Sequence, residues 1–149
     1  MSPSEAGHSF VETGRFVVHP WHCDANGHLN TRYFQGFFDD ATQHLLALCG
    51  HEAMGAGGRS VVDVRCAMEY KAEVAPGTPI VVRSFFTKLG GKSFTSAHEM
   101  RSVDGATLFA TCETVSVFFD LQARASAPMT DFFRAKASRL MTPAAAPTL

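Results

Sequence analysis

The stretch His19–Gly50, HPWHCDANGHLNTRYFQGFFDDATQHLLALCG, decides how the rest of the chain is arranged. Its second half carries apolar residues three, four and seven positions apart, the spacing of one helix face. These residues are Phe34, Phe37, Phe38, Ala41, Leu45 and Leu48. Asn30 or Thr31 is a suitable N-cap, and Gly50 is a suitable C-terminal stop. The pattern predicts one long helix over residues 31–49.

Strand patterns surround this helix. Five segments bounded by turn residues predict strands, at residues 14–19, 60–70, 80–88, 93–101 and 106–120. In the second of these, Val62, Val64, Cys66, Met68 and Tyr70 alternate with polar residues, so we expect one face of that strand to be buried. Residues 131–140 predict a short C-terminal helix. The order predicts an α+β fold, with an antiparallel five-stranded sheet wrapped around one long central helix.

Length and composition favour one globular domain over residues 1–149, with a core at about 14–135 and flexible tails at 1–10 and 141–149. The net charge is −1 and no Lys/Arg stripe is present, so nucleic acid is not an expected partner. No apolar run reaches the roughly 20 residues of a membrane span, and the N-terminus lacks a signal-peptide pattern. Four scattered cysteines without a C-x-x-C spacing indicate free thiols in the cytoplasm.

A polar loop directly precedes the long helix and holds the candidate chemistry. Asp24 lies close to a helix N-terminus, where unpaired N–H groups and the helix dipole favour negative charge. An acid beside such an oxyanion site is an arrangement suited to hydrolysis. Gly27 allows a positive φ or a close approach to substrate. The alternative for Asp24 is a structural Asx-turn to Asn26 or Gly27.

Other polar side chains support weaker hypotheses. His28 either orients Asp24, binds substrate or is structural. His19, His22 and His28 match no established ligand spacing, so no metal site is expected. Cys23, next to Asp24, is not expected to be a nucleophile, because sequence neighbours on a loop seldom reach the required geometry. His98 alternates with apolar residues and is expected to be a hydrogen-bonded core histidine.

An ordered set of motifs adds a family resemblance. The set comprises Asp24-Ala25-Asn26-Gly27-His28-Leu29-Asn30, Tyr33, Phe38-Asp39-Asp40-Ala41, Glu69-Tyr70, Ala75-Pro76-Gly77, the hairpin Leu89-Gly90-Gly91-Lys92-Ser93-Phe94 and Val117-Phe118-Phe119-Asp120. Together these motifs resemble the hot-dog fold acyl-CoA thioesterase superfamily that includes 4-hydroxybenzoyl-CoA thioesterase. The resemblance spans residues 14–135. Tyr33 lies one residue nearer to Asp24 than in many members, which leaves open which backbone N–H plays which role.

The resemblance implies hydrolysis of an acyl-CoA thioester, with Asp24 as nucleophile or general base and no cofactor beyond the CoA of the substrate. The expected oxyanion region comprises Gly27, Asn30, Thr31 and Arg32. The expected substrate contacts are His28, Tyr33, Phe34, Phe37, Arg59, Lys88, Gly90, Gly91, Lys92 and Ser93. The cations among them are candidates for the CoA phosphates. Hot-dog subunits pair edge to edge with sites at the interface, so a homodimer or homotetramer is implied.

Two other functions remain open from the sequence. One is a hot-dog protein that binds an acyl-CoA without hydrolysing it. The other is a hot-dog enoyl-CoA hydratase or dehydratase, although those families centre on a histidine with the acid presented differently, and this chain has no His-Phe-Pro arrangement. The identity of the acyl group, and the choice between CoA and an acyl-carrier protein, depend on the shape of the pocket.

Overall fold

The computed structural model describes residues 9–51 and 58–142. The strands are β1 (Val11–Val17), β2 (Arg59–Tyr70), β3 (Pro79–Leu89), β4 (Ser93–Ser102), β5 (Leu108–Asp120) and β6 (Ala125–Ser126). The helices are α1 (Thr31–Leu48), α2 (Asp131–Ser138) and a short 3-10 turn at Pro20–His22. The two-residue β6 and the 3-10 turn are too short to produce a sequence period, and the sequence did not predict them.

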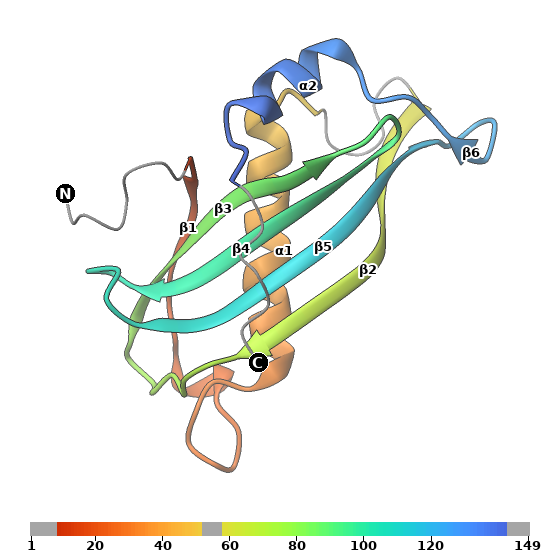
Figure 1. Ribbon diagram of the computed structural model, residues 1–149. Coiled ribbons are helices and arrows are strands. Elements are labelled where there is room, and N and C mark those ends of the chain that lie inside the picture. The colour runs from red at the N-terminus through yellow and green to blue at the C-terminus, as the bar shows by residue number, and fades with distance from the viewer. Residues whose placement is uncertain (1–8, 52–57, 143–149) are drawn as a thin grey trace.

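All strand pairs are antiparallel, and the sheet order is β1-β3-β4-β5-β2, with β6 added beside β5. Figure 1 shows the sheet curving past α1, which crosses one of its faces, while α2 lies near the C-terminal end of α1. The expected α+β arrangement of a five-strand sheet, one long helix and a short C-terminal helix is therefore confirmed. No helix in the described part of the chain is long and apolar enough to cross a membrane.

The two ends of α1 follow the predicted capping residues. Asn30 is the N-cap, and its side-chain oxygen accepts a hydrogen bond from Arg32 N–H at 3.0 Å. At the other end Gly50 adopts φ +81°, a conformation that glycine takes without steric cost. The N–H groups of Gly50 and His51 then bond the carbonyls of Ala47 and Leu46, both at 3.0 Å. This pattern closes the helix as a Schellman motif.

The buried face of α1 differs slightly from the predicted face. The buried residues are Phe34, Phe38, Ala41, Thr42, Leu45 and Leu46. Phe37 is only partly buried, and Leu48 is 53% exposed, so the expectation of a buried Leu48 is wrong. The helix packs mainly against β1 and β3, which places its apolar stripe over that half of the sheet.

Two apolar clusters fill the space under α1. The first surrounds the N-terminal half of the helix and includes Phe34, Phe38, Ile80, Val82 and Cys112. The second lies at the C-terminal half, where Phe86, Phe94, Phe118 and Phe133 of α2 contact one another with ring centroids 4.9–5.9 Å apart. Such aromatic contacts add to the free energy gained by burial. The short helix α2 therefore closes one end of the core.

Strand β2 departs most from its sequence pattern. None of its twelve residues is buried, and Val62 and Val64 are 37% and 60% exposed. A register shift between Asp63 and Arg65 marks a bulge, which breaks the alternation of the two faces. The strand also lies at the sheet edge, away from the strands that α1 covers. The expectation of a continuous buried face in this segment is therefore wrong.

The described residues at the two chain ends pack on the sheet. Thr142 is buried, and its hydroxyl donates to the carbonyl of Ser9 at 2.7 Å. The backbone at Met141 forms an isolated parallel bridge with Phe86. The expected flexible tail thus does not begin at residue 141. Most of both expected tails, and most of the Gly-rich stretch between α1 and β2, lie outside the described residues.

A chain of polar side chains crosses the core around His98, which is fully buried. His98 Nδ1 lies 2.6 Å from Ser84 Oγ, which lies 2.7 Å from Thr13 Oγ1. His98 Nε2 lies 3.1 Å from Thr42 Oγ1 and 3.3 Å from Ser96 Oγ. These contacts join β1, β3, β4 and α1, and they confirm the expected hydrogen-bonded core histidine. Burial lowers the pKa of His98 from 6.5 to about 4.

The His98 pKa predicts a specific loss of stability in mild acid. Between pH 6.5 and about 4 the unfolded chain binds a proton at His98 that the folded chain does not, so stability falls as pH falls through this window. We expect His98 to account for about 2 kcal/mol of loss between pH 7 and pH 5. Urea unfolding of the wild type and His98→Gln at both values measures this contribution. Equal losses in the two proteins would contradict it.

Candidate functional site

The loop before α1 is a small closed structure. Cys23 and Leu29 form an isolated antiparallel bridge, and Asp24 N–H donates to His28 O at 3.1 Å. Gly27 has φ +79°, which allows its N–H to return to Asp24 O at 2.9 Å. Leu29 N–H donates to Val74 O, also at 2.9 Å, and so ties the loop to the segment that follows β2. The loop therefore holds Asp24 in a fixed place relative to the helix.

The two carboxylate oxygens of Asp24 differ in their hydrogen bonding. Its Oδ1 accepts a hydrogen bond from Asn26 N–H at 2.9 Å, which confirms the Asx-turn considered from the sequence. Its Oδ2 accepts no hydrogen bond from the described part of the chain. The residue is exposed. One oxygen thus supports the turn, while the other remains available to a ligand or to water.

The first backbone N–H groups of α1 are nearly all in use. Arg32 N–H donates to the side chain of Asn30, and Tyr33 N–H donates to its carbonyl at 2.9 Å. Asn30 N–H itself donates to His22 O at 2.9 Å. Thr31 N–H is the first helical N–H and has no partner within the described residues. Of the N–H groups of Thr31 and Arg32, only that of Thr31 is therefore open to a ligand, because the Arg32 N–H donates to the cap.

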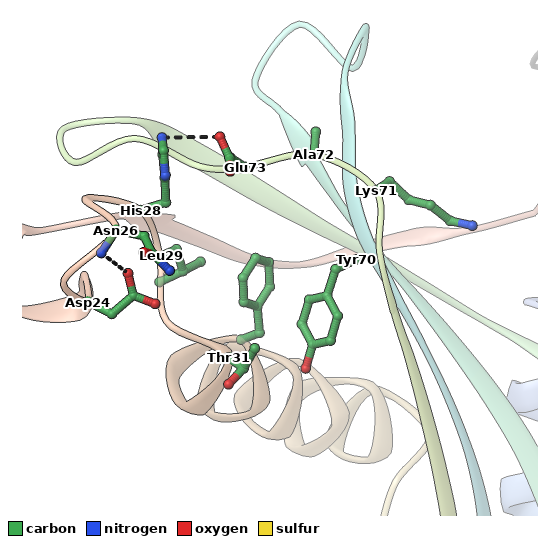
Figure 2. Close-up of a pocket in the computed structure, with 10 residues that line it drawn as sticks. Asp24, Asn26, His28, Leu29, Thr31, Tyr70, Lys71, Ala72 and Glu73 are labelled. Atoms are coloured by element: carbon green, nitrogen blue, oxygen red, sulfur yellow. Dashed lines mark hydrogen bonds and ion pairs between the residues drawn. The ribbon is translucent and has the colours of Figure 1, made fainter.

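Asp24 and Thr31 line one pocket of about 290 Å³, shown in Figure 2, whereas Asn30 and Arg32 do not line it. Its lining residues are Asp24, Asn26, His28, Leu29, Thr31, Phe34, Tyr70, Lys71, Ala72 and Glu73. Tyr70 and Phe34 form an apolar wall, with ring centroids 5.1 Å apart in an edge-to-face contact. The volume lies at the lower limit of ordinary ligand pockets. The pocket combines a carboxylate, a helix N-terminus and an aromatic wall.

His28 faces away from Asp24. Its Nε2 lies 3.3 Å from Glu73 Oε2, and Figure 2 shows its ring directed toward Glu73. Its Nδ1 is buried and has no hydrogen-bond partner. His28 thus fixes the loop against the segment after β2, and it makes no contact with Asp24 that would orient the carboxylate. It lies in the pocket wall, and a contact with substrate stays a prediction.

Tyr33 and Phe37 lie on a different side of α1 from the pocket. The His22 ring makes edge-to-face contacts with Tyr33 and Phe37, at 5.0 and 5.2 Å between centroids. Phe37 also contacts Phe16 of β1 at 4.7 Å. Of the three expected acyl contacts on the helix, only Phe34 lines the pocket. The helix period explains this result, because Tyr33 and Phe37 lie about 100° and about 60° away from Phe34 around the helix axis.

The expected CoA contacts lie at the other end of the molecule. Arg59 begins β2 and Tyr70 ends it, so about 36 Å of strand separates Arg59 from the pocket. The hairpin containing Gly90 lies beside α2, where Arg134 Nη2 donates to Gly90 O at 2.7 Å and Met129 N–H donates to Gly91 O at 2.9 Å. Within one chain, therefore, the residues Arg59, Lys88, Gly90, Gly91, Lys92 and Ser93 do not join the Asp24 pocket.

The sequence did not predict one wall of the pocket. This wall consists of Tyr70, the last residue of β2, and of Lys71, Ala72 and Glu73, which follow the strand. Only Tyr70 belonged to a noted motif. Figure 2 shows the Tyr70 ring over the first turns of α1, while the Lys71 side chain points away from the other labelled residues. An exposed Tyr at the end of a predicted strand is the signal that could have indicated this wall. No group of three or more potential metal ligands occurs within the described residues.

Comparison with solved structures shows that this is a hot-dog fold. The 1,4-dihydroxy-2-naphthoyl-CoA thioesterase of Synechocystis matches with a TM-score of 0.75 and 18% identity, covering 92% of this chain and 100% of that one. A Staphylococcus aureus hypothetical protein in complex with CoA matches with a TM-score of 0.80 and 15% identity, over 95% and 92%. A gentisyl-coenzyme A thioesterase matches with a TM-score of 0.72 and 19% identity, over 83% and 97%.

The family follows from the sequence itself. The model of the thioesterase-like superfamily matches residues 18–137, which include the loop, α1 and strands β2 to β6. The chain therefore belongs to the thioesterase-like superfamily, as the motifs indicated. A comparison with curated protein sequences gives no match.

The cap at Asn30 predicts a measurable stability loss. In Asn30→Ala the Arg32 N–H loses its acceptor, and we expect a cost of about 1 kcal/mol, or about 3 °C in Tm. Asn30→Asp keeps an oxygen in place and serves as the matched control. Thermal unfolding of the three proteins measures the difference. An Ala variant as stable as the wild type would show that the cap does not hold this helix end.

Proposed function

We propose that the protein is an acyl-CoA thioesterase whose site is built on Asp24 and the N-terminus of α1. The observation that carries this proposal is that the free carboxylate oxygen and the open Thr31 N–H belong to residues lining the same pocket. Membership of the thioesterase-like superfamily supports the reaction type. The four free cysteines are consistent with the proposed location of the protein in the cytoplasm, where thiols stay reduced.

The chemistry follows from the two groups. The thioester oxygen accepts a hydrogen bond from Thr31 N–H, where the helix dipole stabilises the negative charge that develops in the transition state. Asp24 either attacks the carbonyl carbon or removes a proton from the attacking water. If Asp24 attacks, the C–S bond breaks to leave the acyl group on Asp24 as a mixed anhydride, which water then hydrolyses to the free acid and the Asp24 carboxylate. If water attacks, its oxygen becomes part of the free acid as the C–S bond breaks. In both routes the water that is consumed supplies the proton with which CoA leaves as the thiol. Phe34 and Tyr70 offer the acyl group an apolar surface.

A second copy of the chain would complete the site. The outer edge of β2 is free of strand partners in the described structure, and its exposed Val62 and Val64 form an apolar surface along it. Unpaired edges of this kind readily pair with another strand. We propose that two β2 strands pair antiparallel across a two-fold axis near their centres, joining two sheets into one.

This pairing would also explain why the candidate CoA-binding cations lie far from the pocket of their own chain. Antiparallel β2 strands place the start of the partner's strand beside Tyr70, and therefore beside the pocket. Ser93 and Val62 are both paired with Val117, so the Lys92 hairpin lies about 10 Å across the sheet from β2. Arg59, Lys88 and Lys92 of the partner subunit would thus approach the pocket and meet the CoA phosphates.

Asp24→Asn is the direct test of the proposed reaction. Asparagine keeps an oxygen for the Asx-turn but cannot act as a base or a strong nucleophile, so we expect hydrolysis of a panel of acyl-CoAs to fall by 10²-fold or more. The measurement is steady-state release of CoA thiol by both proteins. Full activity in Asp24→Asn would rule out the mechanism.

Asp104→Asn provides a matched control. Asp104 Oδ1 also accepts a backbone N–H two residues on, from Ala106 at 3.0 Å, but it lies in the β4–β5 turn. We expect this variant to retain wild-type activity. If neither wild type nor variant hydrolyses any thioester, yet acyl-CoA raises the Tm of both, the protein is a non-hydrolytic binder and the proposal fails.

The dimer predicts that a charge on β2 will reduce both assembly and activity. Val64→Lys places an ammonium on the free strand, where pairing would require its desolvation or a like-charge contact across the axis. We expect sedimentation to shift from dimer to monomer and kcat/KM to fall at least tenfold. Val103→Lys, at a similarly exposed valine in the β4–β5 turn, should change neither. A fully active Val64→Lys monomer would contradict a shared site.

A further inference from the structure

The fold gathers cationic side chains at one end of the molecule. Figure 1 shows α2, the β3–β4 hairpin, the turn before β6 and the start of β2 at this end. These segments supply seven of the thirteen lysines and arginines: Arg59, Lys88, Lys92, Arg124, Arg134, Lys136 and Arg139. The seven residues form the basic end of the molecule. They are spread between positions 59 and 139, which is why the sequence shows no stripe.

The cations of the basic end have no carboxylate partner within the described residues. Six of them are exposed, and Arg134, which donates to Gly90 O at 2.7 Å, is half-buried. Elsewhere four cations pair with carboxylates, as Arg15–Glu12, Arg65–Glu113, Lys71–Glu69 and Arg101–Glu99. In the described part of the chain only Asp120 and Asp131 bring a carboxylate to this end. Asp120 lies opposite Arg59 in the ladder, but its Oδ1 accepts two backbone N–H groups of the following turn.

The basic end extends beyond the cations assigned above to the CoA phosphates. Arg134, Lys136 and Arg139 belong to α2 and its C-cap, and α2 packs on β3. In the sheet order β3 lies three strands from β2, or about 14 Å. The α2 cations would therefore stay open to solvent when two β2 edges pair. Their charge has no role in binding CoA alone.

The surroundings of these cations favour an acidic protein over two other anionic partners. Domains that bind nucleic acid are strongly basic, whereas this chain has a net charge of −1. A helix that lies on a membrane exposes an apolar face, but Phe133 and Ala137 of α2 are buried in the core. Phe132 is the one large apolar side chain that the helix exposes. A folded acidic protein needs only a limited patch of opposite charge, such as one end of this molecule.

We propose that the basic end docks a small acidic protein that carries the acyl group as a thioester on a phosphopantetheine arm. The proposal rests on the proposed thioesterase function and specifies the carrier from which the acyl group is released. CoA has the same arm, so the Asp24 pocket would act on either thioester. Water adds across the C–S bond: its oxygen and one hydrogen enter the free acid, and its other hydrogen goes to the sulfur of the carrier. A carrier docked on α2 of one subunit would deliver its arm to the pocket of the other.

The first test is binding of a holo acyl-carrier protein, which bears the arm without an acyl group. Titration calorimetry with the full-length protein should show binding that weakens as the salt concentration rises. Lys136→Gln combined with Arg139→Gln should weaken it about tenfold, because both exposed cations would face the carrier. Arg15→Gln, which removes an exposed arginine already paired with Glu12 on β1, should leave the affinity unchanged.

The second test compares hydrolysis of the two kinds of thioester. The acyl group that is hydrolysed best in the CoA panel is loaded onto the acyl-carrier protein, and release of the thiol is measured. We expect the Lys136→Gln, Arg139→Gln double variant to lower kcat/KM for the carrier thioester about tenfold and to leave kcat/KM for the acyl-CoA unchanged. A purely structural role of these side chains would lower both values alike.

Several results would overturn the proposal. One is binding of the holo carrier that ignores salt or is equal in the wild type and the double variant. Another is no binding of the carrier while a DNA duplex or phosphatidylglycerol vesicles bind through the same two cations. Binding of the holo carrier is measured without hydrolysis, so it would persist if the thioesterase function failed. Failure of docking, in turn, would leave hydrolysis of acyl-CoA unaffected.

Discussion

The hydrogen bonds of Asn30 are the constraint on which the candidate site depends. Its N–H bonds the carbonyl of His22, its side chain caps Arg32, and its own carbonyl receives Tyr33. One residue thus joins the 3-10 turn, the loop and the helix. The neighbouring bond from Leu29 to Val74 attaches the same loop to the segment after β2. The position of Asp24 beside the helix terminus follows from these few backbone contacts.

The sequence predicted those parts of the fold that depend on a period or on a capping residue. The spacing of Phe34, Phe38, Ala41 and Leu45 places α1 correctly, and Gly50 ends it. The buried His98 was predicted from its place in an alternating strand. These features are local, because each is decided by residues within a few positions of one another. The same is true of the Asx-turn at Asp24.

The features that the sequence did not predict depend on how segments far apart in the chain are placed relative to one another. The alternation of Val62 and Val64 indicated a buried face, yet both are exposed because β2 bulges and lies at the sheet edge. An alternating pattern indicates that one face of a strand packs against apolar residues. It does not indicate whether those residues belong to the same chain or to another one. The motif pieces at Asp24 and Lys92 were assigned to one site on the family resemblance. Within one chain the fold separates them by the length of the sheet, and a site shared between two subunits stays a prediction.

Both that separation and the exposure of β2 would follow from the proposed two-fold pairing of β2 strands. A two-fold axis perpendicular to an antiparallel strand pair exchanges the two ends of the strand, so the most distant residues of one chain become neighbours across the pair.

The pairing must also keep its register, because a slip of one residue would turn every side chain to the opposite face. The bulge near Asp63 lies close to the middle of β2, where it would limit such slips. An edge strand with apolar side chains and a fixed irregularity at its centre is thus suited to one partner, a second copy of itself. In the proposed dimer, the small pocket of a single chain would form the acidic half of a site whose cationic half comes from the partner.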